Sequence, residues 1–322
     1  MQRQRWAVVL AGGSGARLQE MIGRHEGKTA PKQYCSLNGG PSLLRLALAR
    51  ACAVVPCDRV LCVVAEEHEE WWGRELEELP PENILVQPMN RGTAIGTLYS
   101  LLAIQTRDPS ARILFMPADH YVTEEAILSR AVSTTFLALE QNPRRVLLLG
   151  IEPDKADSEL GYILSNKQSG SLAQPVVHFV EKPSTRHAKK LIRKGALWNS
   201  FVFAAEAAGL LALFRKRLPE TTANFEALSA RLIQDASRLT KYYRNLSSAD
   251  LSNDVFSGAE HDLGVLRVPS CGWTDLGTPE RLVRCLSGAN KYAIAPHPNH
   301  PEHRSRVNLA NVCQSALSAS LN

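Results

Sequence analysis

The chain passes from an apolar run into a glycine-rich loop at Trp6-Ala7-Val8-Val9-Leu10-Ala11-Gly12-Gly13-Ser14-Gly15-Ala16-Arg17-Leu18. The apolar run has the composition of a buried parallel strand. The glycines have no Cβ, so the backbone can turn sharply and approach a ligand closely. Backbone N–H groups in such a loop can point at phosphate oxygens, and Arg17 and Lys32 add positive charge. This layout predicts a site for a nucleoside triphosphate.

Two better-known phosphate-binding loops do not fit this stretch. The dinucleotide fingerprint G-x-G-x-x-G, counted from Gly13, needs a glycine where Leu18 stands. A Walker A loop needs four residues between its first glycine and Gly-Lys-Thr, whereas Gly27-Lys28-Thr29 follows Gly23 with three between them. The first mismatch argues against an NAD-dependent dehydrogenase.

Composition places the chain among globular proteins. It has 322 residues, of which 44% are hydrophobic and 21% charged, and a net charge of +5. This mild charge favours anionic substrates without singling out nucleic acid, and no segment approaches the roughly 20 apolar residues of a membrane span. The seven cysteines form no C-x-x-C pair, which favours reduced thiols in a cytosolic protein. We expect a cytoplasmic protein with no nucleic-acid or membrane partner.

Strands and helices alternate in the first half of the chain. We expect strands at 6–10, 60–65, 113–116 and 146–151, and helices at 42–54, 66–79, 93–106 and 123–141. The alternation predicts an α/β fold with a parallel sheet covered by helices on both faces. Ligands of such sheets lie beyond the carboxyl ends of the strands, so Gly12, Asp119 and the loop near Asn90 should converge. In the second half we expect strands at 162–165, 176–180 and 200–204 and helices at 184–194, 205–218 and 220–239.

Further polar residues follow apolar runs. Asp119 comes just after one such run, and Asp275 lies in Gly272-Trp273-Thr274-Asp275-Leu276-Gly277-Thr278. Phosphoryl chemistry needs a hard cation held by one or two carboxylates together with substrate phosphates. The pair Glu181-Lys182 offers one acceptor for sugar hydroxyls and one cation for a phosphate, and Asn199 could hydrogen-bond hydroxyls. Taken singly, such residues more often serve as helix caps, turn formers and surface salt bridges.

The order of the motifs carries more information than any one of them. Leu-Ala-Gly-Gly-x-Gly-x-Arg-Leu, Pro-Lys-Gln, Pro-x-Asn-Arg-x-Thr-Ala, Pro-Ala-Asp-His, Gly-Tyr-Ile, Val-Glu-Lys-Pro, Trp-Asn-Ser and Trp-Thr-Asp-Leu-Gly follow one another. This order resembles the sugar-phosphate nucleotidylyltransferases, most closely the mannose-1-phosphate guanylyltransferases, over about residues 6–286. The resemblance implies a Rossmann-like nucleotide-diphospho-sugar transferase fold, with a mixed sheet whose parallel core is flanked by helices. It also implies a catalytic domain over 1–288, with a sugar-binding part at about 152–275; we interpret 289–322 as a tail or appendage.

The resemblance also assigns roles to residues. It implies that the nucleotide is bound by Leu10, Ala11, Gly12, Gly13, Gly15, Arg17, Asn90 and Thr93. The catalytic groups would be Arg17, Lys32, Asp119 and Lys182, and Asp119 and Asp275 would bind Mg²⁺. The sugar phosphate would be bound by Gly161, Glu181, Lys182 and Asn199.

The implied reaction joins GTP and a hexose 1-phosphate, with GDP-mannose and pyrophosphate as the expected products. The substrates are small molecules, and a homodimer stays open. The chain departs from the family pattern at 19–30 and at Phe201, where glycine is usual beside the expected sugar pocket. Alternatives are therefore the same chemistry on glucose or heptose 1-phosphate, the use of UTP, or a non-catalytic nucleotide-sugar sensor.

Overall fold

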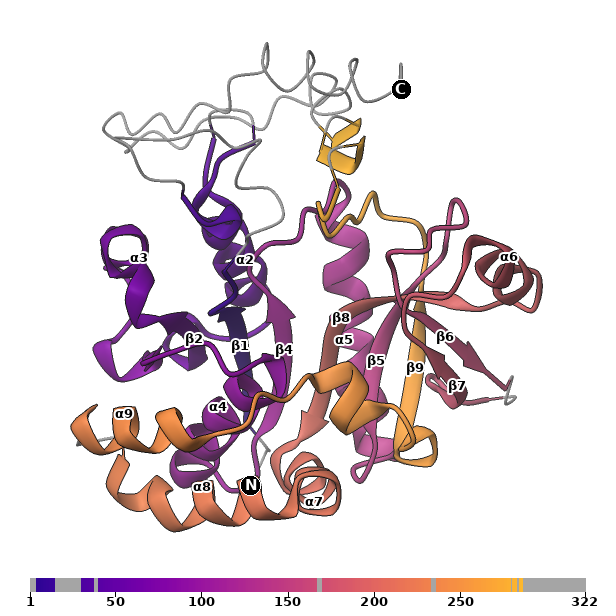
Figure 1. The fold of residues 1–322 in the computed structure, drawn as a ribbon. Coiled ribbons are helices and arrows are strands. Elements are labelled where there is room, and N and C mark those ends of the chain that lie inside the picture. Colours follow the sequence, from indigo (N-terminus) through magenta and orange to yellow (C-terminus); the bar gives the residue numbers. More distant parts are fainter. Residues whose placement is uncertain are drawn as a thin grey trace.

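A computed structural model describes residues 4–14, 30–37, 40–166, 170–232, 236–278, 280–282 and 284–285. Its centre is one nine-stranded sheet in the order β3-β2-β1-β4-β8-β5-β9-β7-β6 (Figure 1). The predicted mixed sheet with a parallel core is confirmed. Residues 289–322, predicted as a tail, lie outside the described residues.

The first half of the sheet is parallel. β1 (Arg5–Ala11) lies between β2 (Val60–Ala65) and β4 (Arg112–Pro117), and β3 (Ile84–Gln87) pairs with β2. β1, β2 and β4 are buried on both faces, which explains their nearly continuous apolar sequences, whereas alternate residues of β3 are only half-buried. All four therefore end at the same edge, where the glycine loop and Asp119 follow β1 and β4.

The second half is mixed. β8 (Leu197–Glu206) runs antiparallel to both β4 and β5 (Val146–Ile151), and β9 (Leu263–Val268) is parallel to β5. β7 (Gln174–Val180) and β6 (Tyr162–Ser165) complete the sheet in antiparallel pairings. β6 also pairs with the start of β8, so the end of the sheet curls back on itself.

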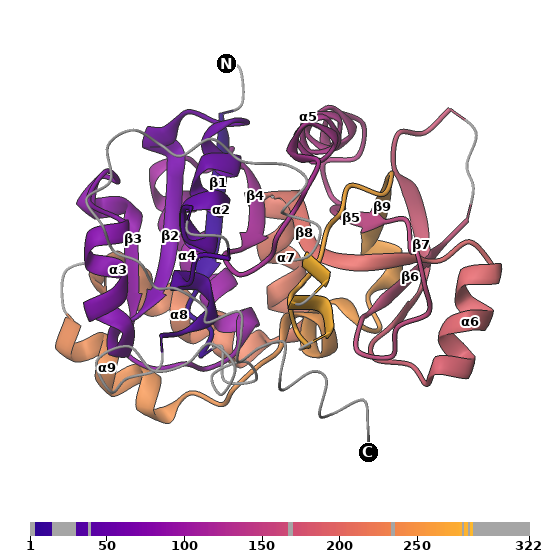
Figure 2. The same cartoon turned by 90° about the horizontal axis from the view of Figure 1, so that it is seen from above.

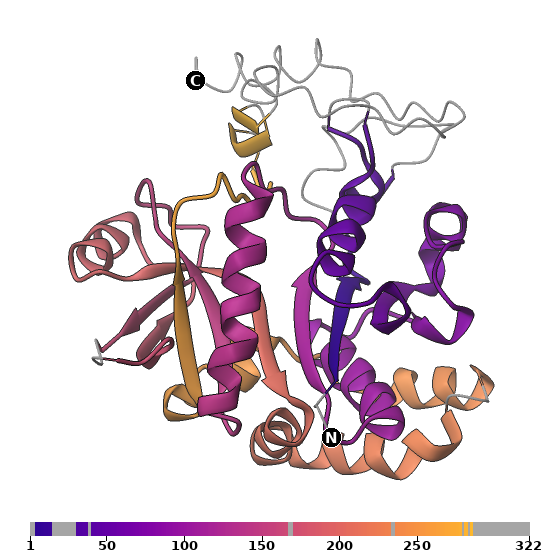
Figure 3. The same ribbon diagram turned by 180° about the vertical axis from the view of Figure 1, so that it is seen from behind.

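Helices cover both faces of the sheet. α2 (Leu43–Cys52), α5 (Glu125–Gln141) and α6 (Thr185–Arg193) pack on one face, where Figure 3 shows α2 and α5 in front of the strands. The other face carries α4 (Thr93–Arg107), α7 (Ala207–Arg217), α8 (Pro219–Leu232) and α9 (Ala236–Asn245). α3 (Glu69–Glu75) and α6 lie at opposite ends of the molecule (Figure 2).

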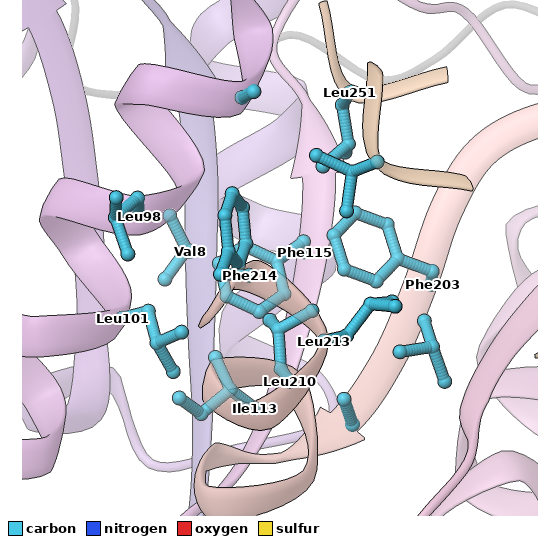
Figure 4. Packing of buried hydrophobic residues seen from close by; sticks show 14 of the residues in the cluster. Val8, Leu98, Leu101, Ile113, Phe115, Phe203, Leu210, Leu213, Phe214 and Leu251 are labelled. Carbon is cyan, nitrogen blue, oxygen red and sulfur yellow. The ribbon is translucent and has the colours of Figure 1, made fainter. Parts of the chain in front are cut away.

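Alternate residues of β1 pack into two separate hydrophobic cores, one on each face of the sheet. Val8 packs with α4 and α7, whereas Val9 belongs to the cluster under α2 and α5. In the first core the rings of Phe115 and Phe203 stack 4.7 Å apart, which joins β4 to β8 (Figure 4). This contact holds the two halves of the sheet together below the edge where the site residues gather.

Several local expectations need correction. The helix expected at 66–79 is a short 3-10 turn followed by α3, and the helix expected at 220–239 is two helices, α8 and α9. Cys52 and Cys57 form a disulfide, although the sequence favoured reduced thiols, because the chain turns back just after α2 and brings them together. Within the described residues, none of the helices has the length and apolar character that crossing a membrane requires.

Candidate functional site

A buried lysine joins three distant segments. Lys32 is 8% exposed, and its Nζ lies 2.8 Å from Asp119 Oδ2 and donates to the Asp275 carbonyl oxygen at 2.6 Å. Asp119 follows β4, and a pair of backbone hydrogen bonds of 2.9 Å between Tyr121 and Thr274 holds the Asp275 loop against it. The structure therefore brings Lys32, Asp119 and Asp275 together at the carboxyl end of the parallel strands.

Gln33 fixes the glycine loop. Its Nε2 donates to the carbonyl oxygens of Ala11 at 2.9 Å and of Gly13 at 2.8 Å, which uses both of its N–H groups. Gln33 is 2% exposed, and its bond to Ala11 is shielded from water. In the sequence Gln33 is only the last residue of Pro-Lys-Gln. Its position directly after Lys32 was the one feature that could have pointed to a role in the site.

A second glutamine lies beside the loop. Gln87 ends β3 and is 5% exposed. A Cβ on Gly12 would lie 3.1 Å from its Oε1, and one on Gly96 would lie 2.8 Å away. The amide thus occupies the space that two glycines leave open, next to the predicted nucleotide loop. Sequence reasoning missed Gln87 because β3 itself was not predicted.

The predicted loop at 90–93 is tied to the segment after α9. The Arg91 guanidinium donates to the Tyr243 carbonyl oxygen at 2.8 Å and so caps the end of α9. Thr93 Oγ1 accepts from the backbone N–H of Leu251 at 2.9 Å, and Asn90 Oδ1 accepts a backbone N–H within the loop at 2.8 Å. Asn90 and Thr93 are both exposed, whereas the Arg91 side chain is used to hold the end of α9.

The electrostatics of this region follow from burial and neighbouring charges. Burial raises the pKa of Asp119, but the charge and the hydrogen bond of Lys32 oppose this, and the pKa lies below its ordinary value. Burial lowers the pKa of His120, which keeps this imidazole neutral at pH 7. Trp273 Nε1 donates to His120 Nδ1 at 3.3 Å, so the ring proton is on Nε2, 3.7 Å from Asp119 Oδ1.

Three of the predicted sugar-binding residues meet at a second place. The residues adjoining Gly161, Glu181 and Asn199 are paired with one another across β6, β7 and β8. A Cβ on Gly161 would lie 2.6 Å from Glu181 Oε2 and 3.3 Å from Asn199 Cβ, so the close approach requires glycine. The backbone N–H of Asn199 also donates to the Gly161 carbonyl oxygen at 2.8 Å.

One buried donor of this second place, Asn199 Nδ2, has no hydrogen bond within the described residues. A buried donor without a partner is costly, and such groups in a folded protein commonly await a ligand or water. Asn199 Oδ1, by contrast, accepts from the backbone N–H of Phe201 at 3.0 Å. One end of the Asn199 amide is therefore fixed and the other is available.

Left-handed backbone marks the same segments. Among the described residues, the non-glycine residues with positive φ are Lys182 at 44°, Phe201 at 56° and Leu276 at 51°. Each lies next to or within a predicted site motif, where strained backbone commonly serves function. The Phe201 ring lies edge-on to His120, with centroids 6.3 Å apart, and so connects the second place to Asp119.

The remaining predicted residues are placed as follows. Leu10 and Ala11 end β1, directly before Gly12 and Gly13. Gly15 and Arg17 lie outside the described residues. Lys182 is exposed and makes no hydrogen bond or ion pair with the described part of the chain, so its predicted contact with a phosphate stays a prediction.

Comparison with known proteins agrees with this arrangement. A family model described as Nucleotidyl transferase matches residues 6–291. The chain belongs to the nucleotidyl transferase family. The resemblance drawn from the order of the motifs is thereby confirmed, and so is the fold that it implied.

Individual relatives are more distant. Xanthan biosynthesis protein XanB of Xanthomonas campestris pv. campestris (strain B100) is 29% identical over 276 residues, which are 84% of this chain and 57% of that protein. The mannose-1-phosphate guanylyltransferase of Escherichia coli (strain K12) is 26% identical over 287 residues, 86% of this chain and 59% of that protein. A Thermus thermophilus structure described as a mannose-1-phosphate geranyltransferase superposes with a TM-score of 0.76 at 31% identity, over 88% of this chain and 79% of that chain. The chain thus spans less than three fifths of the two curated relatives.

Members of this family generally use a divalent metal ion, and the donors present here suit one. No group of three or more His, Cys, Asp or Glu side chains gathers as a metal cluster in the described ranges. A Mg²⁺ site in phosphoryl transfer needs only one or two carboxylates, because substrate phosphates and water complete the shell. Lys32 already places a cation against both Asp119 Oδ2 and the Asp275 carbonyl oxygen. The residues therefore fit a hard cation at this position.

Proposed function

We propose that this chain joins a nucleoside triphosphate, GTP, to a hexose 1-phosphate, mannose 1-phosphate, with release of pyrophosphate. The observation that carries the proposal is the Lys32 bridge, because it gathers Asp119 and Asp275 beside the glycine loop that Gln33 holds. Family membership and the names of the relatives support the same reaction class.

The proposed chemistry needs no protein nucleophile. An oxygen of the sugar phosphate attacks the α-phosphorus of the triphosphate, and the bond from this phosphorus to the bridging oxygen of the β-phosphate breaks. Catalysis then consists of positioning and charge neutralisation. Mg²⁺ held by Asp119 and Asp275 would supply neutralisation of phosphate charge when bound.

The chain's own residues divide between the two substrates. Backbone from Leu10 to Gly13, with Gly15, Arg17, Asn90 and Thr93, would bind the nucleotide, and Lys32 would lie at the phosphates. Gly161, Glu181 and Asn199 would bind the sugar, and Lys182 would bind its phosphate. The unpaired Asn199 Nδ2 supports this assignment, because a sugar hydroxyl can accept its hydrogen bond. We assign the catalytic domain to 1–288, and the family match over 6–291 supports this boundary.

The decisive experiment is a matrix of substrates. Pyrophosphate release is measured with Mg²⁺ for GTP, ATP, UTP and CTP, each with mannose, glucose or a heptose 1-phosphate. We expect the highest kcat/KM for GTP with mannose 1-phosphate and loss of turnover when EDTA removes the metal. A different best pair would reassign the substrate, which the Phe201 ring beside the sugar residues makes a real alternative. Binding of nucleotide-sugar without turnover in any combination would reject the enzyme and favour a sensor.

A further inference from the structure

A buried arginine outside the predicted site joins two carboxylates from distant segments. Arg281 is 4% exposed. Its Nη2 lies 2.6 Å from Asp157 Oδ1 in an ion pair, and its Nε donates one hydrogen bond to Asp157 Oδ2 at 3.2 Å. Its Nη1 also donates to Asp275 Oδ1. Arg281 therefore links the Asp275 loop to the loop between β5 and β6.

Both carboxylates are held in place by their own surroundings. The Tyr162 hydroxyl accepts from the backbone N–H of Asp157 at 2.8 Å and donates to its carbonyl oxygen at 2.9 Å. Asp275 Oδ1 also accepts from the backbone N–H of Gly277 at 3.0 Å. Because Tyr162 directly follows Gly161, the arginine connects the Asp275 carboxylate with the strand that begins at the proposed sugar residues.

The charges and hydrogen bonds of this cluster show which carboxylate oxygen can still bind a cation. Burial raises the pKa of Asp157, but the hydrogen bond and the charge of Arg281, with smaller contributions from the Glu159 N–H and Lys155, lower it more, so Asp157 is ionised at neutral pH. Asp157 thus offsets the charge of Arg281, and Lys155 Nζ, 3.8 Å away, is its second cationic neighbour. Within the described residues, both hydrogen bonds to the Asp275 carboxylate fall on Oδ1. Oδ2 is the oxygen left for a cation.

We propose that Arg281, itself held by Asp157, is a positioning residue that fixes the Asp275 carboxylate so that Oδ2 serves as a metal ligand. The proposal rests on the proposed function in taking Asp275 as a ligand of the divalent ion. Hydrogen-bond partners behind a ligating side chain set its orientation, and their loss typically weakens metal binding by about 10- to 100-fold. We expect an effect of this size from Arg281, although it touches neither substrate nor metal.

The test measures metal binding directly. Mn²⁺ alone is titrated into the full chain without substrates, and the free ion is followed by its electron paramagnetic resonance signal. Arg281→Met should weaken Mn²⁺ binding by about 10- to 100-fold. The matched control is Arg284→Met, because Arg284 lies in the same segment and pairs with the neighbouring loop residue Asp154 at 3.5 Å, with both side chains about half exposed. This control should bind Mn²⁺ as the wild type does.

A second variant separates positioning from folding. Arg281→Met leaves the largely buried Asp157 without its closest ion-pair partner, so a fall in thermal stability is expected as well. The double variant Asp157→Asn/Arg281→Met removes this uncompensated charge and should regain most of the lost Tm while Mn²⁺ binding stays weak. If the double variant regained both, Arg281 would be a purely structural residue and the proposal would be wrong.

The outcome is independent of the substrate matrix. Mn²⁺ affinity equal to the wild type in Arg281→Met, or a wild type that binds no Mn²⁺ at millimolar concentration, contradicts the positioning role. Conversely, Mn²⁺ binding that depends on Arg281 in a protein that turns over no substrate pair would uphold the positioning role and reject the proposed function.

Discussion

The glycine-loop half of the sheet and the half that carries β6 and β7 differ in how their polar site residues are paired. On the first side, Lys32, Gln33 and Thr93 all make hydrogen bonds or ion pairs within the chain. On the second side, Asn199 Nδ2 is buried without a hydrogen-bond partner in the described residues. Under the proposed function, the nucleotide side is braced before its ligand arrives, whereas the sugar side is completed by its ligand.

The largest effect is expected where the two sides meet. Asp119→Asn removes the carboxylate charge beside Lys32 and should lower the rate of pyrophosphate release by about 10²- to 10³-fold, as the loss of one charge-stabilising contact does elsewhere. The amide has nearly the same shape, so circular dichroism and Tm should show a folded protein. Asp154→Asn, which changes an exposed carboxylate paired with Arg284, is the control and should turn over normally. Near wild-type turnover of Asp119→Asn would exclude Asp119 from the chemistry.

The sugar side can be perturbed by adding a methyl group where Gly161 approaches Glu181 and Asn199 most closely. Gly161→Ala places a methyl group 2.6 Å from Glu181 Oε2, and either the carboxylate or the backbone must move. Crowding of this kind costs about 1–3 kcal/mol, so the KM for the sugar 1-phosphate should rise roughly 10- to 100-fold while the nucleotide KM stays unchanged. Gly73→Ala is the control, because no atom lies within 4 Å of its added Cβ. A nucleotide KM that rose equally would refute the separation of the two sides.

The nucleotide side is tested by removing a side chain's hydrogen-bond donors, where the previous variant added an atom. Gln33→Leu removes the donors to the carbonyl oxygens of Ala11 and Gly13, leaving a buried acceptor at Ala11 and a loop without its brace. A buried acceptor left unsatisfied costs about 1–3 kcal/mol, and we expect a lower Tm with a nucleotide KM about tenfold higher. The KM for the sugar 1-phosphate, measured at saturating nucleotide, should change little. The two sides are separated most clearly if Gln33→Leu raises only the KM for the nucleotide and Gly161→Ala raises only the KM for the sugar 1-phosphate.

The sequence predicted the longer, locally encoded strands of this fold better than its short strand and the strand that pairs over a long range. The predicted strands at 60–65, 146–151 and 162–165 coincide with β2, β5 and β6, because buried apolar runs bounded by polar residues identify strands well. β3 and β9 were missed. β3 has only four residues, and β9 pairs with β5 from more than a hundred residues away, which no local pattern reveals.

The candidate site shows the same division. Motifs after strands led to Asp119, Asp275 and the sugar residues, and the topology brings them together as expected. Residues that hold these groups in place were missed, since Gln87 and Arg281 belong to no motif and Gln33 appeared only as the last residue of Pro-Lys-Gln. Their roles depend on side-chain contacts across the fold, such as Arg281 with Asp157, 124 residues apart.

The last effect, a selective one on substrate, is expected at Phe201. Its φ of 56° suits glycine, so Phe201→Gly relieves about 1–2 kcal/mol of backbone strain. It also removes a half-buried ring, whose edge contact with His120 contributes about 0.5–1.5 kcal/mol beyond the area that the ring buries, so the relief of strain offsets only part of the loss in the free energy of unfolding. Phe201→Ala keeps the strain and loses the ring, and should therefore be the less stable of the two.

If the ring helps select the sugar, both variants should shift kcat/KM among mannose, glucose and heptose 1-phosphates by the same factor and leave the nucleotide KM unchanged. A shift in Phe201→Ala alone would assign the effect to the backbone of this segment and not to the ring.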